Sequence, residues 1–247
     1  MRYFSRIELD DRHAGVREAV AKTFSGNVYS DHQFLWHFFA APAGTARDFL
    51  FRRIDPKGNR RQALFYCVSE RPAVAPHPAW QVESREYAPQ VQAGDRLVFD
   101  LRVNPTQAHK RDGKSRRDDV VMHAKKVIAA EHGVSRWAGV PEDRRPALYD
   151  LAGQAVRQWL GDRSRPGLTA RHGFHALDDL RVDAYRQHRM GRSGEAAISL
   201  STVDLTGTLE VVDPAPFTSA LLHGVGHAKG FGCGLLLVQR PRHKGIL

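Results

Sequence analysis

The segment Asp213–Gln239 reads DPAPFTSALLHGVGHAKGFGCGLLLVQ, and its residue types predict a helix, then a glycine-rich loop, then a strand. Asp213 is a good N-cap and Pro214 suits the first helical position, so a helix is expected to begin here. Lys229 lies in the loop that follows, and the apolar run Leu235–Val238 predicts the strand. The loop contains glycines at positions 224, 226, 230, 232 and 234.

This order argues against two kinds of nucleotide site. A dinucleotide fingerprint runs strand, loop, helix, so that the pyrophosphate meets a helix N-terminus. An NTPase phosphate loop needs a hydroxyl residue directly after its lysine, whereas Gly230 follows Lys229. Two interpretations remain: a tight turn that packs the helix on a sheet, or a loop whose backbone N–H groups approach a phosphate. In the second case the candidate RNA-binding residues of the loop are Lys229, Gly226, Gly230 and Gly232.

The charge of the chain points to a polyanionic partner. It has 247 residues and a formal net charge of +10, which favours RNA or DNA. No apolar run is long enough to span a bilayer and no signal peptide is evident, so we expect no membrane partner and a cytoplasmic location. Cys67 and Cys233 lie in apolar stretches and are expected to be reduced, buried thiols. No cysteine or acidic pattern accompanies the histidines His172 and His175, so no metal is expected.

The first half of the chain predicts an antiparallel sheet with helices. A short amphipathic helix is expected over residues 16–24, and turn residues at Pro56–Asn59 indicate a hairpin. The order approximates the split βαβ pattern of ferredoxin-like folds. The expected strands are Tyr3–Leu9, Arg47–Asp55, Gln62–Glu70 and Gln81–Tyr87.

A second helix is expected within Asn27–Phe39. It starts either at Asn27, a good cap, or at Ser30, where Gln33 completes a capping box. Three side chains fall on one side of it, three and four residues apart: Tyr29, His32 and Trp36. Its apolar face consists of Phe34 or Leu35, with Phe38 and Phe39.

The second half repeats the order of the first. Strands are expected at Asp95–Val103, Gly173–Val182 and Ala196–Val211, with a helix over Ala147–Leu160 before the last two. The inner face of that helix is assigned to Leu148, Leu151, Ala155 and Trp159. The prediction is therefore an α+β fold with two tandem ferredoxin-like (βαββαβ) domains, residues 1–88 and 95–247, each with an antiparallel sheet.

Two basic segments are candidates for RNA binding. Thr106–Asp119 is expected to be a basic loop, either solvated and disordered or ordered on a nucleic acid. Tyr185–Gly194 is expected to be a basic hairpin tip, with the shape and charge to enter a nucleic-acid groove. The candidate residues are Lys110, Arg111, Lys114, Arg116 and Arg117 in the loop, and Arg186, Arg189 and Arg192 in the hairpin.

Four stretches together resemble one known family. They are YSDHQFLWHFF at 29–39, RDFLFR at 47–52, LRVNP at 101–105 followed by the basic loop, and GVGHAKGFGCGLLLV at 224–238. In this order and spacing the chain resembles the CasE-type crRNA-processing endoribonucleases of type I, subtype E CRISPR systems. The resemblance implies two ferredoxin-like domains and metal-free cleavage of the CRISPR repeat transcript on the 3′ side of a hairpin. It also implies no cofactor, a retained RNA product, and partnership with the other Cascade subunits.

The resemblance carries over to individual residues. The family pattern Tyr-x-x-His-x-x-Leu-Trp matches Tyr29, His32, Leu35 and Trp36, which implies His32 as the catalytic histidine and Tyr29 as its companion. Lys229 matches the lysine of the family's glycine-rich loop.

These residue types suit RNA cleavage by the RNA's own 2′-hydroxyl, which leaves a 2′,3′-cyclic phosphate. A histidine titrating at about 6.5 can act as general acid or as general base, and both assignments stay open. Tyr29 suits a donor or orienting role, and Lys229 with the loop amides can stabilise developing charge. Two other functions are considered: a non-catalytic RNA-binding scaffold, and a metal-dependent nuclease, for which clustered carboxylates are missing from the sequence.

Overall fold

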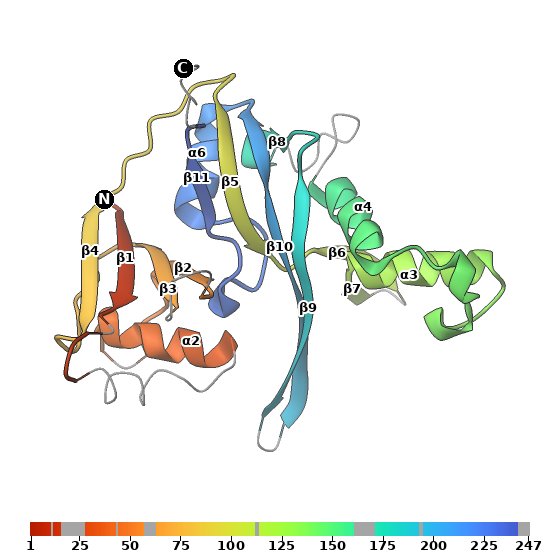
Figure 1. The fold of residues 1–247 in the computed structure, drawn as a ribbon, viewed down its shortest axis with the longest axis horizontal. Helices are drawn as coiled ribbons and strands as arrows, with labels where there is room; N and C mark the ends of the chain where they lie inside the picture. Colours follow the sequence, from red (N-terminus) through yellow and green to blue (C-terminus); the bar gives the residue numbers. More distant parts are fainter. Residues whose placement is uncertain are drawn as a thin grey trace. The chain divides into compact units, whose positions relative to one another are not determined.

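The computed structural model describes residues 1–10, 12–15, 28–42, 44–56, 63–111, 114–160, 171–192 and 195–241. They form two compact units (Figure 1): Met1–Gln90 with Leu221–Leu235, and Val91–Ala220 with Leu236–Leu247. The glycine-rich segment thus folds with the first unit, far from it in sequence. The sequence-based domain bounds, 1–88 and 95–247, remain a prediction.

The first unit contains a four-stranded antiparallel sheet in the order β2-β3-β1-β4. Strand β3 lies between β1 and β2, which is the split βαβ order of a ferredoxin-like domain. The strands are β1 (Tyr3–Leu9), β2 (Phe49–Ile54), β3 (Leu64–Ser69) and β4 (Trp80–Glu86), all within two residues of the predicted bounds.

Helix α2 (Val28–Leu35), continued by the 3₁₀ turn η1 (Trp36–Phe38), packs its aromatic residues on this sheet. The ring of Phe34 lies 5.7 Å from that of Phe65 on β3 and 5.0 Å from that of Trp80 on β4. The four residues of the predicted apolar face are all buried: Phe34, Leu35, Phe38 and Phe39. The alternative start at Ser30 is wrong, because Ser30 lies inside the helix. The expected helix over 16–24 and the cap at Asn27 fall outside the described residues.

The connection from β3 to β4 is irregular rather than helical. Arg71 secures it: Nε lies 2.7 Å from the Asp48 carboxylate, and Nη1 and Nη2 donate to the carbonyls of Ala40 and Phe39. One guanidinium thus ties the connector to the end of η1 and to the residue before β2.

The second unit contains an antiparallel sheet in the order β11-β5-β10-β8, with β9 also paired to β10. Strands β8 and β9 pair with different parts of the same edge of β10, so the order is again ferredoxin-like. Its strands are β5 (Arg96–Val103), β8 (Phe174–Ala176), β9 (Arg181–Arg192), β10 (Glu195–Val211) and β11 (Leu236–Gln239). The prediction of one long strand over Gly173–Val182 is wrong, because a turn in which Leu180 N donates to Leu177 O separates β8 from β9.

The described helices of this part of the chain include α3 (Val120–Glu131), α4 (Leu148–Leu160) and α6 (Pro214–His223), whose last three residues belong to the first unit. In α4, Leu151 and Ala155 are buried as predicted and Trp159 is half-buried, but Leu148 is 40% exposed, which corrects its assignment to the inner face. The Asp213 carboxylate accepts from Ala215 N, which confirms the predicted cap of α6. Short 3₁₀ turns follow α3 at Trp137–Gly139 (η2) and Glu142–Arg144 (η3).

The two basic segments are both strand hairpins. Thr106–Asp119 forms the antiparallel pair β6 (Thr106–Arg111) and β7 (Lys114–Asp119), so the prediction of an irregular loop is wrong. In Tyr185–Gly194 a hairpin is confirmed, but residues up to Arg192 lie in β9 rather than at a tip.

Candidate active site

The glycine-rich loop of the first unit is an ordered turn. Val225 N donates to Gly234 O across 2.8 Å and closes its base. Above this pair lies the 3₁₀ turn η4 (Lys229–Phe231), bounded by two residues in the left-handed region, Ala228 at φ 57° and Gly232 at φ 72°. The turn lies against α2 and β2.

The glycines of this loop differ in the reason that each position has no side chain. A Cβ on Gly234 would lie 2.7 Å from Val225 O, and one on Gly232 would lie 2.9 Å from the Phe51 ring, so both serve packing. A Cβ on Gly230 would meet nothing within 4 Å. Gly226, at φ 75°, needs the conformational freedom of glycine. The tight-turn interpretation therefore explains Gly232 and Gly234 but leaves Gly230 facing open space.

Lys229 links the loop to its surroundings through two hydrogen bonds. Its Nζ donates to His223 O at 2.6 Å, and its own carbonyl accepts from Arg47 Nη1 at 2.7 Å. The lysine is half-buried, and its ammonium has three donors, of which the His223 carbonyl takes one.

His32 lies on α2 in a half-buried, aromatic setting. Its ring centroid is 6.2 Å from that of Trp36 and 5.9 Å from that of Phe49. Burial, and then the charge of Arg47, lowers the pKa of His32 below the usual value for histidine. Its Nε2 is buried and has no hydrogen-bond partner in the part of the chain that the structure describes. Such an unsatisfied nitrogen is unusual and costs about 1–3 kcal/mol, which favours a neutral ring that can take up a partner.

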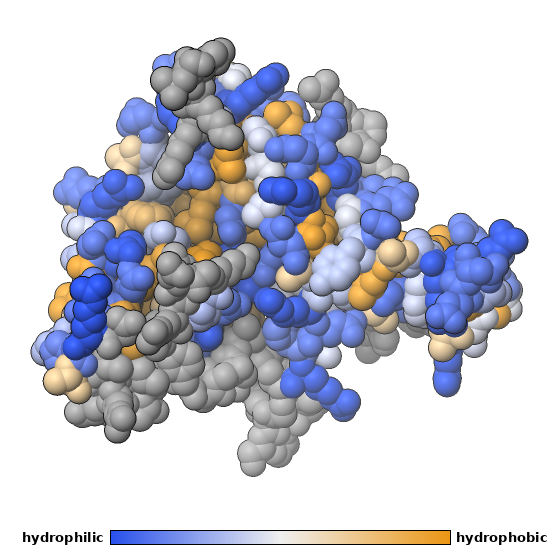
Figure 2. Space-filling view, viewed as in Figure 1, coloured by the Kyte–Doolittle hydropathy of each residue, from blue (hydrophilic) through white to orange (hydrophobic). Residues whose placement is uncertain are grey.

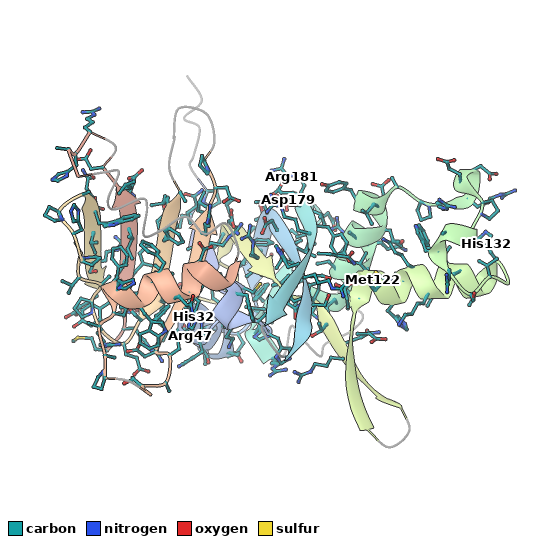
Figure 3. The ribbon with its side chains drawn as sticks, turned by 90° about the horizontal axis from the view of Figure 1, so that it is seen from below. His32, Arg47, Met122, His132, Asp179 and Arg181 are labelled. Carbon is teal, nitrogen blue, oxygen red and sulfur yellow. The ribbon has the colours of Figure 1, made fainter. Side chains whose placement is uncertain are left out.

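Arg47, to which the sequence analysis gave no role although it begins the RDFLFR stretch, lies beside His32 at the entry to β2 (Figure 3). It is half-buried, and its Cζ is 6.0 Å from the centroid of the Phe49 ring. Burial also lowers the pKa of Arg47 itself. The signal in the sequence is the alternation in RDFLFR, which places residues 47, 49 and 51 on one face.

The carboxylate next to His32 in sequence is engaged elsewhere. Asp31 is buried, and its Oδ1 lies 2.9 Å from Arg53 Nη1, while Arg53 Nε lies 2.9 Å from Asp55 Oδ1. This ion pair joins α2 to β2 and so fixes the helix that carries His32.

The other two residues of the matched motif, Leu35 and Trp36, belong to the packing of α2: Leu35 is fully buried and Trp36 packs on Phe49. Tyr29 lies in α2, one helical turn before His32, but its side chain lies outside what the structure describes. Its companion role remains a prediction.

The predicted RNA-binding residues of the basic hairpins lie in the second unit. Arg117, Arg186 and Arg189 have exposed side chains, and Arg186 Nη1 lies 3.4 Å from Asp204 Oδ2. The same carboxylate binds the buried Arg102 in a two-pronged pair, at 2.6 and 2.8 Å. Five further candidates are placed in strands, but their side chains are not described: Lys110 and Arg111 in β6, Lys114 and Arg116 in β7, and Arg192 in β9.

Within the described ranges, no three His, Cys, Asp or Glu side chains are grouped as metal ligands. His223 and His227 are four residues apart, a spacing that the sequence-based predictions overlooked, and both are exposed. None of the described helices combines the length and the apolar character needed to cross a membrane.

Comparison with known proteins places these features in context. Residues 2–240 match the family model described as "CRISPR associated protein". The CRISPR system Cascade subunit CasE of Escherichia coli K12 is 25% identical over 217 residues, which cover 88% of this chain and 94% of that protein. The CRISPR-associated endoribonuclease Cse3 of Thermus thermophilus is 27% identical over 233 residues, covering 86% of this chain and 90% of that protein.

Solved structures share the fold over nearly the whole chain. CRISPR endoribonuclease Cse3 bound to a 19 nt RNA gives a TM-score of 0.61 at 19% identity, covering 97% of this chain and 99% of that one. Cas6e from E. coli K-12 gives 0.52 at 20% identity, covering 97% of this chain and all of the other (100%). The fold is thus α+β with two ferredoxin-like domains, as predicted from the sequence.

Proposed function

Because this chain belongs to the CRISPR-associated protein family, we propose that it is an endoribonuclease that processes precursor crRNA and remains a subunit of a Cascade complex. Its substrate is the CRISPR repeat stem-loop, cut on the 3′ side of the hairpin. The names of two relatives, a Cascade subunit and an endoribonuclease, support this assignment. The observation that carries it is the unsatisfied, buried Nε2 of His32, next to the Arg47 cation and within one folded unit with Lys229.

In this proposal His32 acts on the 2′-hydroxyl. Because its pKa is lowered, the ring is neutral near pH 7 and can accept the proton of the attacking hydroxyl. The 2′-oxygen then bonds to phosphorus as the bond to the 5′-oxygen breaks, and the 5′-oxygen takes a proton from water, giving a 2′,3′-cyclic phosphate and a 5′-hydroxyl. Tyr29 is proposed as a hydrogen-bond donor that orients this centre.

The loop is proposed to hold phosphate. Gly230 faces open space, so its backbone can approach an RNA oxygen. Gly226 and Gly232 give the turn its shape, and the Lys229 ammonium gives it positive charge. The donors near His32 are cationic, and cations repel a divalent metal ion, which supports a metal-free mechanism.

The basic hairpins of the second unit are proposed to bind the RNA stem through its phosphates. The exposed guanidinium groups of Arg117, Arg186 and Arg189 support this role, and it extends to Lys110, Arg111, Lys114, Arg116 and Arg192 by their charge. The buried cysteines Cys67 and Cys233 are not in a disulfide, in keeping with the proposed cytoplasmic location.

A non-catalytic RNA-binding scaffold is the second candidate. It is favoured by the burial of His32 Nε2, because a nitrogen that is closed off from solvent is also closed off from an RNA hydroxyl. The two candidates differ in whether the RNA is cut.

The test is cleavage of a repeat stem-loop RNA in EDTA by wild type, His32→Ala and His37→Ala. His37 is an exposed histidine of the same segment and is the matched control. We expect wild type and His37→Ala to leave a 2′,3′-cyclic phosphate, and His32→Ala to be slower by about 10²–10⁴-fold, the usual contribution of general acid–base catalysis.

The affinity of His32→Ala for the hairpin should stay near that of wild type. Equal cutting by wild type and His32→Ala would move catalysis away from His32. Activity that disappears in EDTA would indicate a metal-dependent nuclease, and tight binding without cutting would establish the scaffold.

A further inference from the structure

We propose that Arg47 is a phosphate-binding residue of this active site, whose guanidinium contacts the phosphate at the cleavage position of the RNA. The inference rests on the proposed endoribonuclease function and adds a role for Arg47, a residue of the RDFLFR stretch to which the sequence analysis assigned none. It is carried by the position, the orientation and the charge environment of Arg47.

The position of Arg47 is fixed from two sides. Nη1 donates to Lys229 O at 2.7 Å, and Cζ lies 6.0 Å from the centroid of the Phe49 ring. The same Phe49 ring lies 5.9 Å from the His32 ring. Arg47 and His32 therefore share one aromatic platform, and a group bound by one is within reach of the other.

The charge of Arg47 has no carboxylate to balance it among the residues that the structure describes. Its neighbours differ: Arg53 is paired with Asp31, and Arg71 with Asp48, the residue that follows Arg47 in sequence. A half-buried cation is costly unless an anion meets it. An RNA phosphate is the anion that the proposed substrate would bring to this place.

The guanidinium has the chemistry for this role. It presents five donors in a planar fork, of which Lys229 O takes one, and the fork matches two oxygens of a phosphate. Negative charge on the non-bridging oxygens grows as the 2′-oxygen attacks phosphorus, so a fixed cation favours the transition state over the ground state. Arg47 exchanges no proton in this step.

The contact would also act on His32. The Arg47 charge is one of the two causes that lower the pKa of His32, after burial. The other charged groups packed nearby are Lys229 on η4 and Asp31 on α2, which is paired with Arg53. A phosphate on Arg47 offsets its charge, so bound RNA makes it easier for His32 to take up a proton.

The experiment compares Arg47→Met and Arg47→Lys with wild type in single-turnover cleavage of saturating stem-loop RNA. Arg85→Met is the matched control, because Arg85 also lies over a phenylalanine ring of the first unit, 5.7 Å from the Phe4 centroid. We expect Arg47→Met to be slower by about 10²–10³-fold, the usual effect of removing one transition-state donor. Arg47→Lys should fall between, and Arg85→Met should match wild type.

Two further readouts separate a phosphate contact from a structural role. Affinity for an uncleavable RNA with a 2′-deoxy residue at the cleavage position should change less than the rate does. Sulfur in place of one non-bridging oxygen at that phosphate should slow wild type and Arg47→Lys more than Arg47→Met, in which no cationic side chain meets that oxygen.

The outcomes are distinct. If the cleavage rate of Arg47→Met is within about threefold of the wild-type rate, the inference is overturned and the proposed function stands. The same conclusion follows if sulfur slows Arg47→Met as much as it slows wild type. Wild type that does not cut at all overturns the proposed function and the inference with it. If Arg47→Met proves unfolded by circular dichroism, the rate and sulfur effect of Arg47→Lys decide the question.

Discussion

The surroundings of His32 and the β9–β10 hairpin both carry positive charge, but they hold it in opposite ways. Near His32, Arg47 and Lys229 are half-buried, and an aromatic ring or a backbone carbonyl fixes each one. On β9, Arg186 and Arg189 are exposed. A desolvated charge interacts strongly with its neighbours and shifts their pKa values. The interaction of an exposed charge with its neighbours is weakened by water and salt, but the charge is open to an approaching polyanion. In the proposed function, this difference would separate the residues that act in cleavage from those that bind the RNA.

The largest effect that would sharpen this comparison concerns the backbone of the glycine-rich loop. Gly234→Ala puts a Cβ 2.7 Å from Val225 O at a φ of 91°, so we expect a loss of about 1–3 kcal/mol in the free energy of unfolding. Urea unfolding measures it. Gly230→Ala is the control, because open space surrounds its Cβ and its stability should stay near wild type. Equal stability of both variants would show that the loop tolerates a different backbone.

A smaller effect is expected on the hairpin. Arg186→Ala with Arg189→Ala should weaken binding of the stem-loop RNA about tenfold, and reduce the slope of log Kd against log salt by about one for each phosphate that is no longer neutralised. Cleavage at saturating RNA should keep its rate. Arg144→Ala, an exposed arginine of η3 in the same unit, controls for net charge. Slower cleavage by the double variant at saturating RNA would show that these arginines act in the cleavage step as well as in RNA binding.

The smallest effect is a change in the titration of His32. Since its pKa lies below the ordinary value of about 6.5, an NMR titration should find more than half of the rings neutral at pH 6.5, where a solvated histidine is half protonated. Arg47→Met removes one of the two causes, so the pKa should rise, yet burial should keep it below the ordinary value. A His32 pKa that does not move in Arg47→Met would mean that the two side chains are not electrostatically coupled.

The strands of the first unit were predicted well because alternation marks β1 and short apolar runs bounded by turn residues mark β2 and β3, which are buried on both faces. The bounds of β1 match the prediction, and alternate residues such as Ser5 and Ile7 are buried. Helix α3 was missed, since only Val120, Val121 and Ala129 of its residues are buried and its apolar pattern is weak. Figure 2 shows a mostly hydrophilic surface on the lobe at the right of the view, where α3 lies with the segment that follows it. The hairpin β6–β7 was missed for a related reason, because its strands are polar and only pairing defines them.

The candidate site divides in the same way. His32 and Lys229 came from motifs, which are local in sequence. Arg47 depends on a hydrogen bond to a residue 182 positions away, and no local pattern records such a contact. Gly232 and Gly234 likewise must be glycine because a Cβ would meet Phe51 and Val225 O respectively. These neighbours are brought close only when the loop folds.

The return of residues 221–235 to the first unit has a consequence for biosynthesis. Domains generally fold in order of synthesis, the N-terminal one first. Here the first strands and α2 leave the ribosome long before Lys229, so the earliest unit to emerge waits for its glycine-rich loop until most of the second unit has been made. Of the second unit, the residues that follow this loop are 236–247, which include β11. A nascent chain therefore carries His32 without the backbone that positions Arg47, and in the proposed function the site is completed only after the basic hairpins have been synthesised.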